Sequence, residues 1–274
     1  MNSIQPVMTH AQICAVEECA PGIFFFAITA PDIAHRAMPG QFIMVHVPGG
    51  GTDPLLPRPF SICGTEGSLL YLLIKVKGIG TQRISNLQEG QFLHIIGPLG
   101  NYFVLPDRNT NAILVAGGIG IAPLLFLGTY LQQHSSPNKF KLLYGIPSAK
   151  EASVLERFSH LLCYCDIATE DGTTGFHGTV VDLLDTHIRK IAFSQTKDLF
   201  IYACGPRPML TALAAITQNY HITCQASFET KMACGVGACM GCVISDRNGV
   251  YKRICADGPV FPLDDMVQGV GFLK

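Results

Sequence analysis

The sequence predicts a multidomain fold: an N-terminal antiparallel β-barrel, an α/β domain built on a parallel sheet, and a small cysteine-rich C-terminal segment. Three observations predict it. Short apolar runs broken by turn residues fill the first hundred positions. Strand-like and helix-like stretches alternate from residue 112 onward, and glycines and cysteines take over after residue 226. We place the three units at residues 1–105, 106–225 and 226–274.

In the first unit, the apolar or alternating runs lie at residues 23–29, 41–47, 69–76 and 92–96. Glycine and proline separate them, as in Pro21-Gly22 before the first run. Strands of this length and spacing are typical of an antiparallel barrel or sandwich. We expect residues 107–111 to form the linker to the second unit.

In the second unit, strand-like runs at residues 141–144, 163–168 and 199–203 alternate with helical stretches near 179–187 and 206–218. Such alternation predicts βαβ units, whose strands are parallel. The carboxyl ends of parallel strands meet at one edge of the sheet, which is where ligands bind.

Residues 112–131 carry no charge, and twenty such residues are about the length of a membrane span. Three glycines and Pro123 interrupt the run, so we interpret it as a strand, a glycine turn and a helix over about 121–133. The N-terminus lacks the charged and apolar regions of a secretory signal. We therefore expect a cytoplasmic protein with no membrane segment.

Composition narrows the class of protein. Of the 274 residues, 48% are hydrophobic and 14% are charged, against about 25% charged in a typical domain, which excludes a disordered chain. The formal net charge is −1 and no basic block occurs. The sequence thus has no electrostatic footprint for nucleic acid or for an anionic membrane.

The C-terminal cysteines carry the most specific motif. Cys234, Cys239, Cys242 and Cys255 follow C-x4-C-x2-C with a fourth cysteine after twelve residues, the plant-type ferredoxin spacing for a 2Fe-2S cluster, although with a shorter gap. The interleaved glycines allow backbone N–H groups to turn toward the electron-rich sulfurs. A segment this short has no core of its own, so we expect a metal centre to organise it.

Other interpretations of the cysteines remain open. A structural zinc site is one, although it usually shows paired C-x2-C knuckles. Disulfides are disfavoured without a secretory signal. The chain has eleven cysteines, and six are expected to pack as small apolar residues: Cys14, Cys19, Cys63, Cys163, Cys165 and Cys224.

Three further motifs suggest nucleotide binding, each with a structural alternative. The R-P-F-S-I run at 58–62 offers an arginine to clamp phosphate, or is a buried strand. The K-V-K-G-I-G-T run at 75–81 is a small phosphate nest or an ordinary glycine turn. Residues 117–123 form a partial G-x-G-x-x-G between a strand and a helix, and could equally be a tight packing turn.

No catalytic side chain is predicted. The nine histidines are scattered without ligand spacing, and no nucleophile lies beside a base. The chemistry must therefore come from cofactors.

The chain resembles the ferredoxin-NADP reductase superfamily over nearly its whole length. The motifs that carry the resemblance are, in order, R-P-F-S-I, G-I-G-T, G-P-L-G-N, A-G-G-I-G-I-A-P-L, A-C-G-P-R-P-M and C-G-V-G-A-C-M-G-C. Within the superfamily, the cluster motif and the ending C-A-D-G-P-V-F are similar to the electron-transfer subunits of NAD-dependent dihydroorotate dehydrogenase B.

The resemblance implies FAD on the barrel, NAD on the parallel sheet and a 2Fe-2S cluster in the tail. The matching flavin positions are Arg58, Pro59, Phe60 and Ser61, then Leu73, Ile74 and Lys75, then Gly80 and Thr81 at the pyrophosphate turn. The NAD positions are Gly118, Gly120, Pro123, Cys204, Gly205 and Pro206, and the cluster ligands are Cys234, Cys239, Cys242 and Cys255. The superfamily usually has tyrosine where this chain has Phe60, so any contact of that hydroxyl is missing.

The resemblance also implies an order of electron flow and a partner. NAD exchanges two electrons as hydride and a cluster exchanges one, so the flavin must stand between them. In the family, dihydroorotate is oxidised at FMN in a separate catalytic subunit, with two of each chain in a heterotetramer, in pyrimidine (UMP) biosynthesis. A catalytic TIM barrel needs about 250 residues of its own, so that site must lie on another chain, and Met240 and the glycines beside the cluster are candidate docking surface.

Two other functions fit part of these observations. One is the FAD and 2Fe-2S subunit of a sulfhydrogenase or of an NADH-dependent ferredoxin:NADP oxidoreductase. The other is a non-catalytic nucleotide-binding module with a zinc-stabilised tail. For the dinucleotide, the only basic residue nearby after the strand that ends at Tyr144-Gly145 is Lys150, and no arginine is close by to grip a 2′-phosphate, which favours NAD over NADP.

Overall fold

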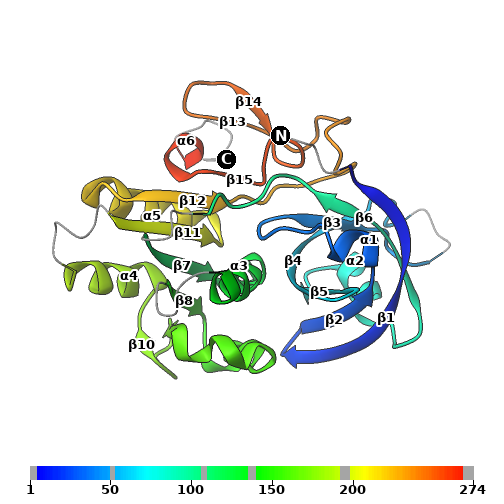
Figure 1. Cartoon of the computed structure of the whole chain (residues 1–274), viewed down its shortest axis with the longest axis horizontal. Coiled ribbons are helices and arrows are strands. Elements are labelled where there is room, and N and C mark those ends of the chain that lie inside the picture. Colours follow the sequence, from blue (N-terminus) through cyan, green and yellow to red (C-terminus); the bar gives the residue numbers. More distant parts are fainter. Residues whose placement is uncertain (1–4, 50–52, 106–109, 135–139, 192–197, 268–274) are drawn as a thin grey trace.

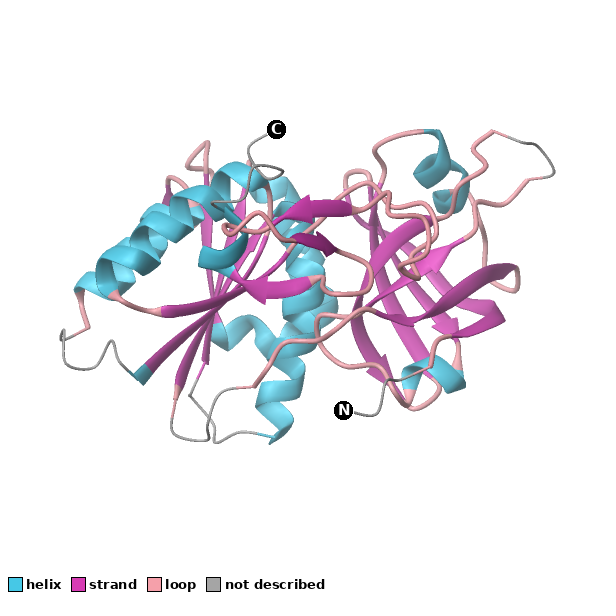
Figure 2. Ribbon diagram, turned by 90° about the horizontal axis from the view of Figure 1, so that it is seen from above, coloured by secondary structure: helices cyan, strands magenta, loops and turns pink. Residues whose placement is uncertain are grey.

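The computed structural model describes residues 5–49, 53–105, 110–134, 140–191 and 198–267. Figure 1 shows a barrel and an α/β unit side by side, with the C-terminal segment, orange to red, across the top of both. Seen from above, helices cover both faces of the sheet and the barrel stands next to it (Figure 2).

The N-terminal unit is a closed antiparallel barrel. Within the described residues its strands follow the order β1-β2-β5-β4-β3-β6, which excludes the open sandwich. They are β1 (Val7–Ala20), β2 (Ile23–Thr29), β3 (Phe42–Val45), β4 (Arg58–Glu66), β5 (Leu69–Lys75) and β6 (Phe92–Leu99), with α1 (Pro31–Ala34) and α2 (Ile79–Ser85) in the connections. The interior is filled by inward side chains such as Phe26, Ile43 and Ile62.

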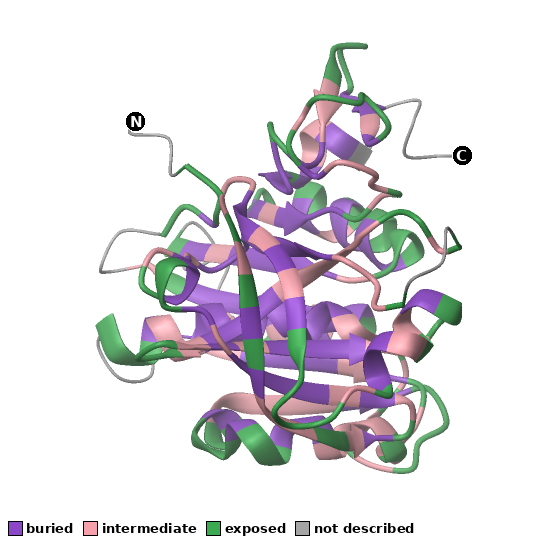
Figure 3. Ribbon diagram, turned by 90° about the vertical axis from the view of Figure 1, so that its right-hand side faces the viewer, coloured by how far each residue is buried: buried purple, intermediate pink, exposed green. Residues whose placement is uncertain are grey.

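Sequence reasoning missed the longest strand. β1 pairs with both β2 and β6 and so closes the barrel. Its exposed positions include His10, Gln12 and Glu17. β1 therefore lacks the continuous run of apolar residues by which the other strands were predicted. Figure 3 shows exposed residues breaking up the outer strands in this way, while buried residues fill the strands behind.

The second unit is a parallel sheet extended by one antiparallel strand. Within the described ranges its order is β10-β9-β8-β7-β11-β12-β15. The parallel strands are β7 (Asn111–Gly117), β8 (Phe140–Ile146), β9 (Cys165–Thr169), β10 (Phe176–His177), β11 (Leu199–Cys204) and β12 (Thr223–Ser227). The expected linker at 107–111 partly differs, because Asn111 already belongs to β7; residues 106–109 lie outside the described residues.

Alternate residues of each strand face opposite layers. Leu114 and Leu142 pack with α3 (Ile121–His134) and the 3-10 segment η2 (Ala149–Tyr164), on the side toward the barrel. Val115 and Leu143 pack with α4 (Val180–Arg189) and α5 (Arg207–Tyr220) on the other side. The strand predicted at 163–168 starts two residues late, because Cys163 and Tyr164 end η2.

The uncharged run from residue 112 folds as expected into β7, the short turn η1 (Gly118–Gly120) and α3. Among the described residues, no helix has the length and apolarity needed to cross a membrane.

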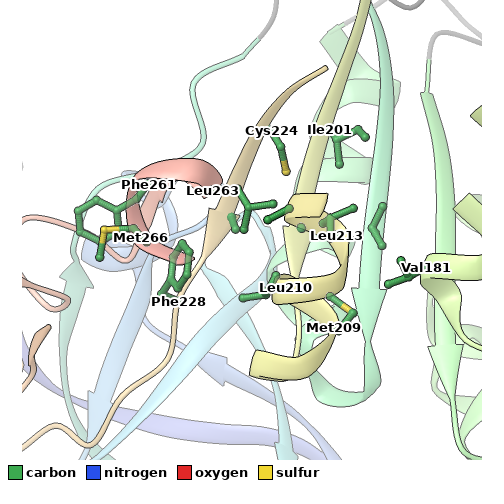
Figure 4. Packing of buried hydrophobic residues seen from close by; sticks show 14 of the residues in the cluster. Val181, Ile201, Met209, Leu210, Leu213, Cys224, Phe228, Phe261, Leu263 and Met266 are labelled. Atoms are coloured by element: carbon green, nitrogen blue, oxygen red, sulfur yellow. The ribbon is translucent and has the colours of Figure 1, made fainter. Parts of the chain in front are cut away.

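The C-terminal segment is not held by a metal centre alone, which corrects one expectation. It contains β13 (Val243–Ser245), β14 (Tyr251–Arg253), β15 (Val260–Pro262) and α6 (Leu263–Val267). β15 pairs with β12, and Leu263 and Met266 join the core around Leu210 and Phe228 (Figure 4). The boundary placed after residue 225 falls inside β12. The sequence does not show where the second unit ends, because β12 pairs with β15, a strand more than thirty residues further along the chain.

Candidate cofactor sites

A first cleft lies between the barrel and the start of the cysteine segment. Its walls include residues from the predicted flavin positions, which are Arg58, Pro59, Phe60, Ser61, Leu73, Lys75 and Thr81. They also include Ser227 at the end of β12, and Phe228, Glu229, Thr230 and Met232 from the chain that follows. The structure therefore gathers most of the predicted residues around one cavity, and adds a wall that the motif did not include.

Two predicted flavin positions do not line this cleft. Ile74 points into the barrel core and is fully buried, because alternate residues of a strand face opposite sides and Leu73 and Lys75 take the cleft side. Gly80 lies beneath Arg58, where an added Cβ would come within 2.9 Å of the arginine Nε. Its role is to let the Arg58 side chain lie close to α2.

Thr81 has local partners. Its hydroxyl accepts hydrogen bonds from the N–H groups of Lys77 at 2.9 Å and Gly78 at 3.2 Å, and donates to the Gly78 carbonyl at 2.9 Å. The turn before α2 is therefore preformed, and Thr81 lines the cleft from a fixed position.

A second cleft, of about 550 Å³, opens at the carboxyl edge of the parallel sheet. Gly118, Gly120, Gly205 and Pro206 line it, as the NAD motifs predict. Two other predicted positions do not line it, since Pro123 is buried in the first turn of α3 and Cys204 is buried at the end of β11. Burial raises the pKa of the Cys204 thiol well above its ordinary value, so that thiol is neutral and packs as an apolar group.

The glycines around the second cleft serve two purposes. Gly118 has φ +52° and no atom within 4 Å of an added Cβ, so it forms the turn and leaves the cleft open. At Gly120 an added Cβ would overlap the Cys204 carbonyl and lie 2.8 Å from the Gly205 nitrogen. This glycine thus allows η1 to pack against the end of β11.

The two clefts share a wall. Lys75, Lys77, Ile119 and Glu229 line both of them. In this wall Lys75 Nζ lies 2.7 Å from Glu151 Oε1, which joins β5 of the barrel to η2 of the α/β unit. Ligands in the two clefts would therefore lie side by side.

Sequence reasoning missed several of these wall residues. Met209 lies against Gly117 and Gly205, and Glu151, Glu170 and Glu229 put three carboxylates around the second cleft. For Glu170 a signal was available, because it directly follows β9 at the ligand-binding edge. For Glu151 and Glu229 none was, because their positions depend on the packing of separate units.

The cysteine loop brings the four predicted ligands together in two pairs. The Sγ atoms of Cys242 and Cys255 lie 3.2 Å apart, and the Cys239 N–H points at Cys234 Sγ at 3.4 Å. Further N–H groups aim at these sulfurs, from Gly237 to Cys255 at 3.1 Å and from Gly241 to Cys239 at 3.4 Å. Gly235 and Gly237 have φ +72° and +80°, the left-handed conformation that turns the backbone inward.

These N–H groups stabilise negative charge on sulfur. Burial acts to raise the pKa of the Cys234 thiol, but hydrogen bonds from the Cys239, Val236 and Ala238 backbone outweigh it and lower the pKa to about 6. Burial and the adjacent Cys242 sulfur instead raise the pKa of Cys255 to about 12. Backbone N–H groups that point at the sulfurs stabilise thiolate ligands and an electron-rich group bound by them. Both properties fit an iron–sulfur cluster.

The zinc alternative fits less well. The four sulfurs lie as two pairs, Cys234 with Cys239 and Cys242 with Cys255. Two separate sulfur pairs match a centre with two metal atoms. Of the six cysteines expected to pack, Cys63 and Cys224 are buried, Cys14, Cys19 and Cys165 are half-buried, and Cys163 is exposed, contrary to expectation.

The barrel, the adjoining nucleotide-binding sheet and the shared cleft wall define an oxidoreductase of the ferredoxin-NADP reductase class. Residues 114–215 match the oxidoreductase NAD-binding domain. The fold is similar to that of an NADH-dependent reduced ferredoxin-NADP oxidoreductase, with TM-score 0.81, 25% identity, and 93% of this chain and 89% of that chain covered. It also resembles a ferredoxin NADP+ reductase from Neisseria gonorrhoeae, with TM-score 0.63, 19% identity and coverage of 78% and 91%.

The tail decides the family within this class. Residues 229–267 match the iron-sulfur cluster binding domain of dihydroorotate dehydrogenase B. The electron transfer subunits of dihydroorotate dehydrogenase B (NAD(+)) from Desulforamulus reducens and Listeria monocytogenes are 37% and 33% identical to this chain, covering 92% and 95% of it and 95% and 99% of their own lengths. This chain belongs to that family. It is an electron transfer subunit of an NAD-dependent oxidoreductase of pyrimidine biosynthesis, as the sequence predicted.

Proposed function

We propose that this chain carries electrons from dihydroorotate oxidation on a partner subunit, through a 2Fe-2S cluster and FAD, to NAD. The cluster exchanges single electrons, whereas NAD accepts two electrons and a proton as hydride, and the flavin between them accepts either. The two electrons that dihydroorotate loses thus leave one at a time and arrive together on NAD.

The observation that carries this proposal is the continuity of the three sites. Met232 lines the first cleft, and the first cysteine ligand, Cys234, follows two residues later. Gly235 packs directly on Met44, and Phe42, on the same face of β3, lines the first cleft. Two residues of a strand span about 7 Å, so the cysteine loop, the first cleft and the second cleft follow one another at short range.

We assign FAD to the first cleft and NAD to the second. Arg58 supplies a cation for the flavin phosphates, while Phe60, Leu73 and Phe228 supply apolar surface for a ring system. In the second cleft, Glu170 places a carboxylate at the carboxyl end of β9. Such a residue hydrogen-bonds a ribose hydroxyl and repels a 2′-phosphate, which supports NAD over NADP.

We assign the cluster to the two sulfur pairs, Cys234 with Cys239 and Cys242 with Cys255. Cys239 is exposed, and in the same loop the side chains of Val236 and Met240 are 47% and 53% exposed. Apolar surface around an exposed ligand suits a protein partner. The partner is an FMN-containing dihydroorotate-oxidising subunit, and the assembly contains two of each chain.

The test is analysis of the purified chain, followed by reconstitution. We expect released FAD, two irons and two acid-labile sulfides per chain, and NAD-linked orotate formation when the dihydroorotate-oxidising subunit is co-expressed. One zinc without flavin absorption would refute the cofactor assignment. Cofactors in place but no gain over the partner alone would move the function to a ferredoxin-linked oxidoreductase.

A further inference from the structure

The ion pair between Lys75 and Glu151 differs from the other charges in the wall that the two clefts share. The two side chains are 30% and 16% exposed. Lys77 and Glu229 line both clefts and Glu170 lines the second, but all three are exposed, so water and salt screen them. Arg58 is half-buried but lines only the first cleft. The pair therefore sets most of the unscreened charge in the wall between the two sites.

The two charges of the pair also compensate each other. Among the described residues, Glu151 Oε2 is buried without a hydrogen-bond partner, and so is the nearby Tyr144 hydroxyl. Lys75 is thus the group that compensates the Glu151 carboxylate. Conversely, if Glu151 lost its charge, the Lys75 ammonium would remain uncompensated in the wall of the first cleft.

We propose that Glu151 is a positioning residue: it holds the Lys75 ammonium in the shared wall and cancels its charge there, which keeps the reduction potential of the bound flavin low. The inference rests on the proposed assignment of FAD to the first cleft. Charge near a flavin ring changes its electronics, and an uncompensated cation stabilises the electron-rich reduced form more than the oxidised form.

The experiment measures the reduction potential of the bound flavin by equilibration with a reference dye, in the full chain. We expect Glu151→Gln to shift the flavin–dye equilibrium about tenfold toward reduced flavin, which is 29.6 mV for two electrons. Lys75→Met should shift it the opposite way, and the double variant should return toward the parent value. Glu151→Asp, which keeps the charge but shortens its reach, should shift it in the same direction as Glu151→Gln and by less.

Glu156→Gln is the matched control, because it makes the same chemical change at an exposed position of the same segment, and it should leave the potential unchanged. If Glu151→Gln and Glu151→Asp bind FAD and have the parent potential, the inference is wrong while the FAD assignment stands. If the parent chain contains no FAD, the proposed function fails first and the inference fails with it.

Discussion

At the scale of single residues, the four cysteines that we propose as cluster ligands occupy different environments. Cys242 and Cys255 are buried, Cys234 is half-buried and Cys239 is exposed. The same spacing rule selects all four, but only Cys239 lies where a partner can approach. Cys239 is therefore the proposed ligand whose loss should affect the partner reaction with the least disturbance of the fold.

We expect Cys239→Ser to lose iron and to reduce NAD-linked dihydroorotate oxidation at least about tenfold, since even outer-shell changes at metal sites cost 10–100-fold. Reduction of the FAD by NADH should persist, because both clefts lie outside the loop. Stopped-flow absorbance of the flavin measures its reduction by NADH, and assays with the partner measure NAD-linked dihydroorotate oxidation. Cys163→Ser is the control, as Cys163 is exposed on η2, outside the cysteine loop. Loss of both activities together in Cys239→Ser would contradict the proposed electron order.

Gly120 is the position in the nucleotide turn that should tolerate substitution least. Gly120→Ala places a Cβ against the backbone of Cys204 and Gly205, and overpacking of this kind costs about 1–3 kcal/mol. We expect a lower free energy of unfolding in urea and weaker binding of NAD. Gly78→Ala is the control, because its backbone is extended and no atom lies within 4 Å. Equal stability of the two variants would show that the turn can shift.

At the scale of elements, the G-P-L-G-N motif has a structural role that the sequence did not reveal. Asn101 follows β6, and its side chain accepts from Val260 N–H at 2.8 Å and donates to the Val260 carbonyl at 2.7 Å. Its own N–H donates to the Gly258 carbonyl at 2.6 Å. One asparagine thus joins the end of the barrel to β15, the strand that follows Cys255, the last of the four proposed cluster ligands.

We expect Asn101→Ala to destabilise the chain by about 1–3 kcal/mol, because the buried polar groups of Val260 lose their partner. The cluster should also be lost faster, measured as bleaching of its visible absorbance in the presence of a chelator. Asn86→Ala, at an exposed position after α2, should match the parent protein. Parent-like bleaching of Asn101→Ala would show that β15 is held by its pairing with β12 alone.

At the scale of the whole molecule, the C-terminal segment completes the α/β unit. β15 covers the edge of β12, and the buried residues of the tail are continuous with the core beneath α5. We expect a chain ending at Phe228, just after β12, to unfold at a temperature lower by on the order of 10 °C, or to aggregate through the uncovered strand. Calorimetry checks this. Full-length Cys239→Ser is the control that removes the cluster and keeps the chain, and an unchanged melting temperature of the shortened chain would make the tail an independent unit.

The sequence alone was sufficient for the fold class, most strands and the family. Apolar runs, the strand–turn–helix pattern at 112–133 and the cysteine spacing are local signals, because each reflects the backbone of one short segment. β1 was missed because only Ala11, Ile13 and Ala20 in it are buried, and two register shifts against β2 interrupt its alternation. The six motifs in order carried the resemblance to the family, which the comparisons confirmed.

Only the tertiary structure decided which residues meet. Lys75 and Glu151 lie 76 positions apart, and Asn101 and Val260 lie 159 apart. No periodicity or spacing rule links such pairs, because their contact depends on how the barrel, the sheet and the tail pack together. The sequence thus determined the kinds of cofactor this chain is built for, whereas packing decided the shared wall between the two clefts and the close approach of the cysteine loop to the first.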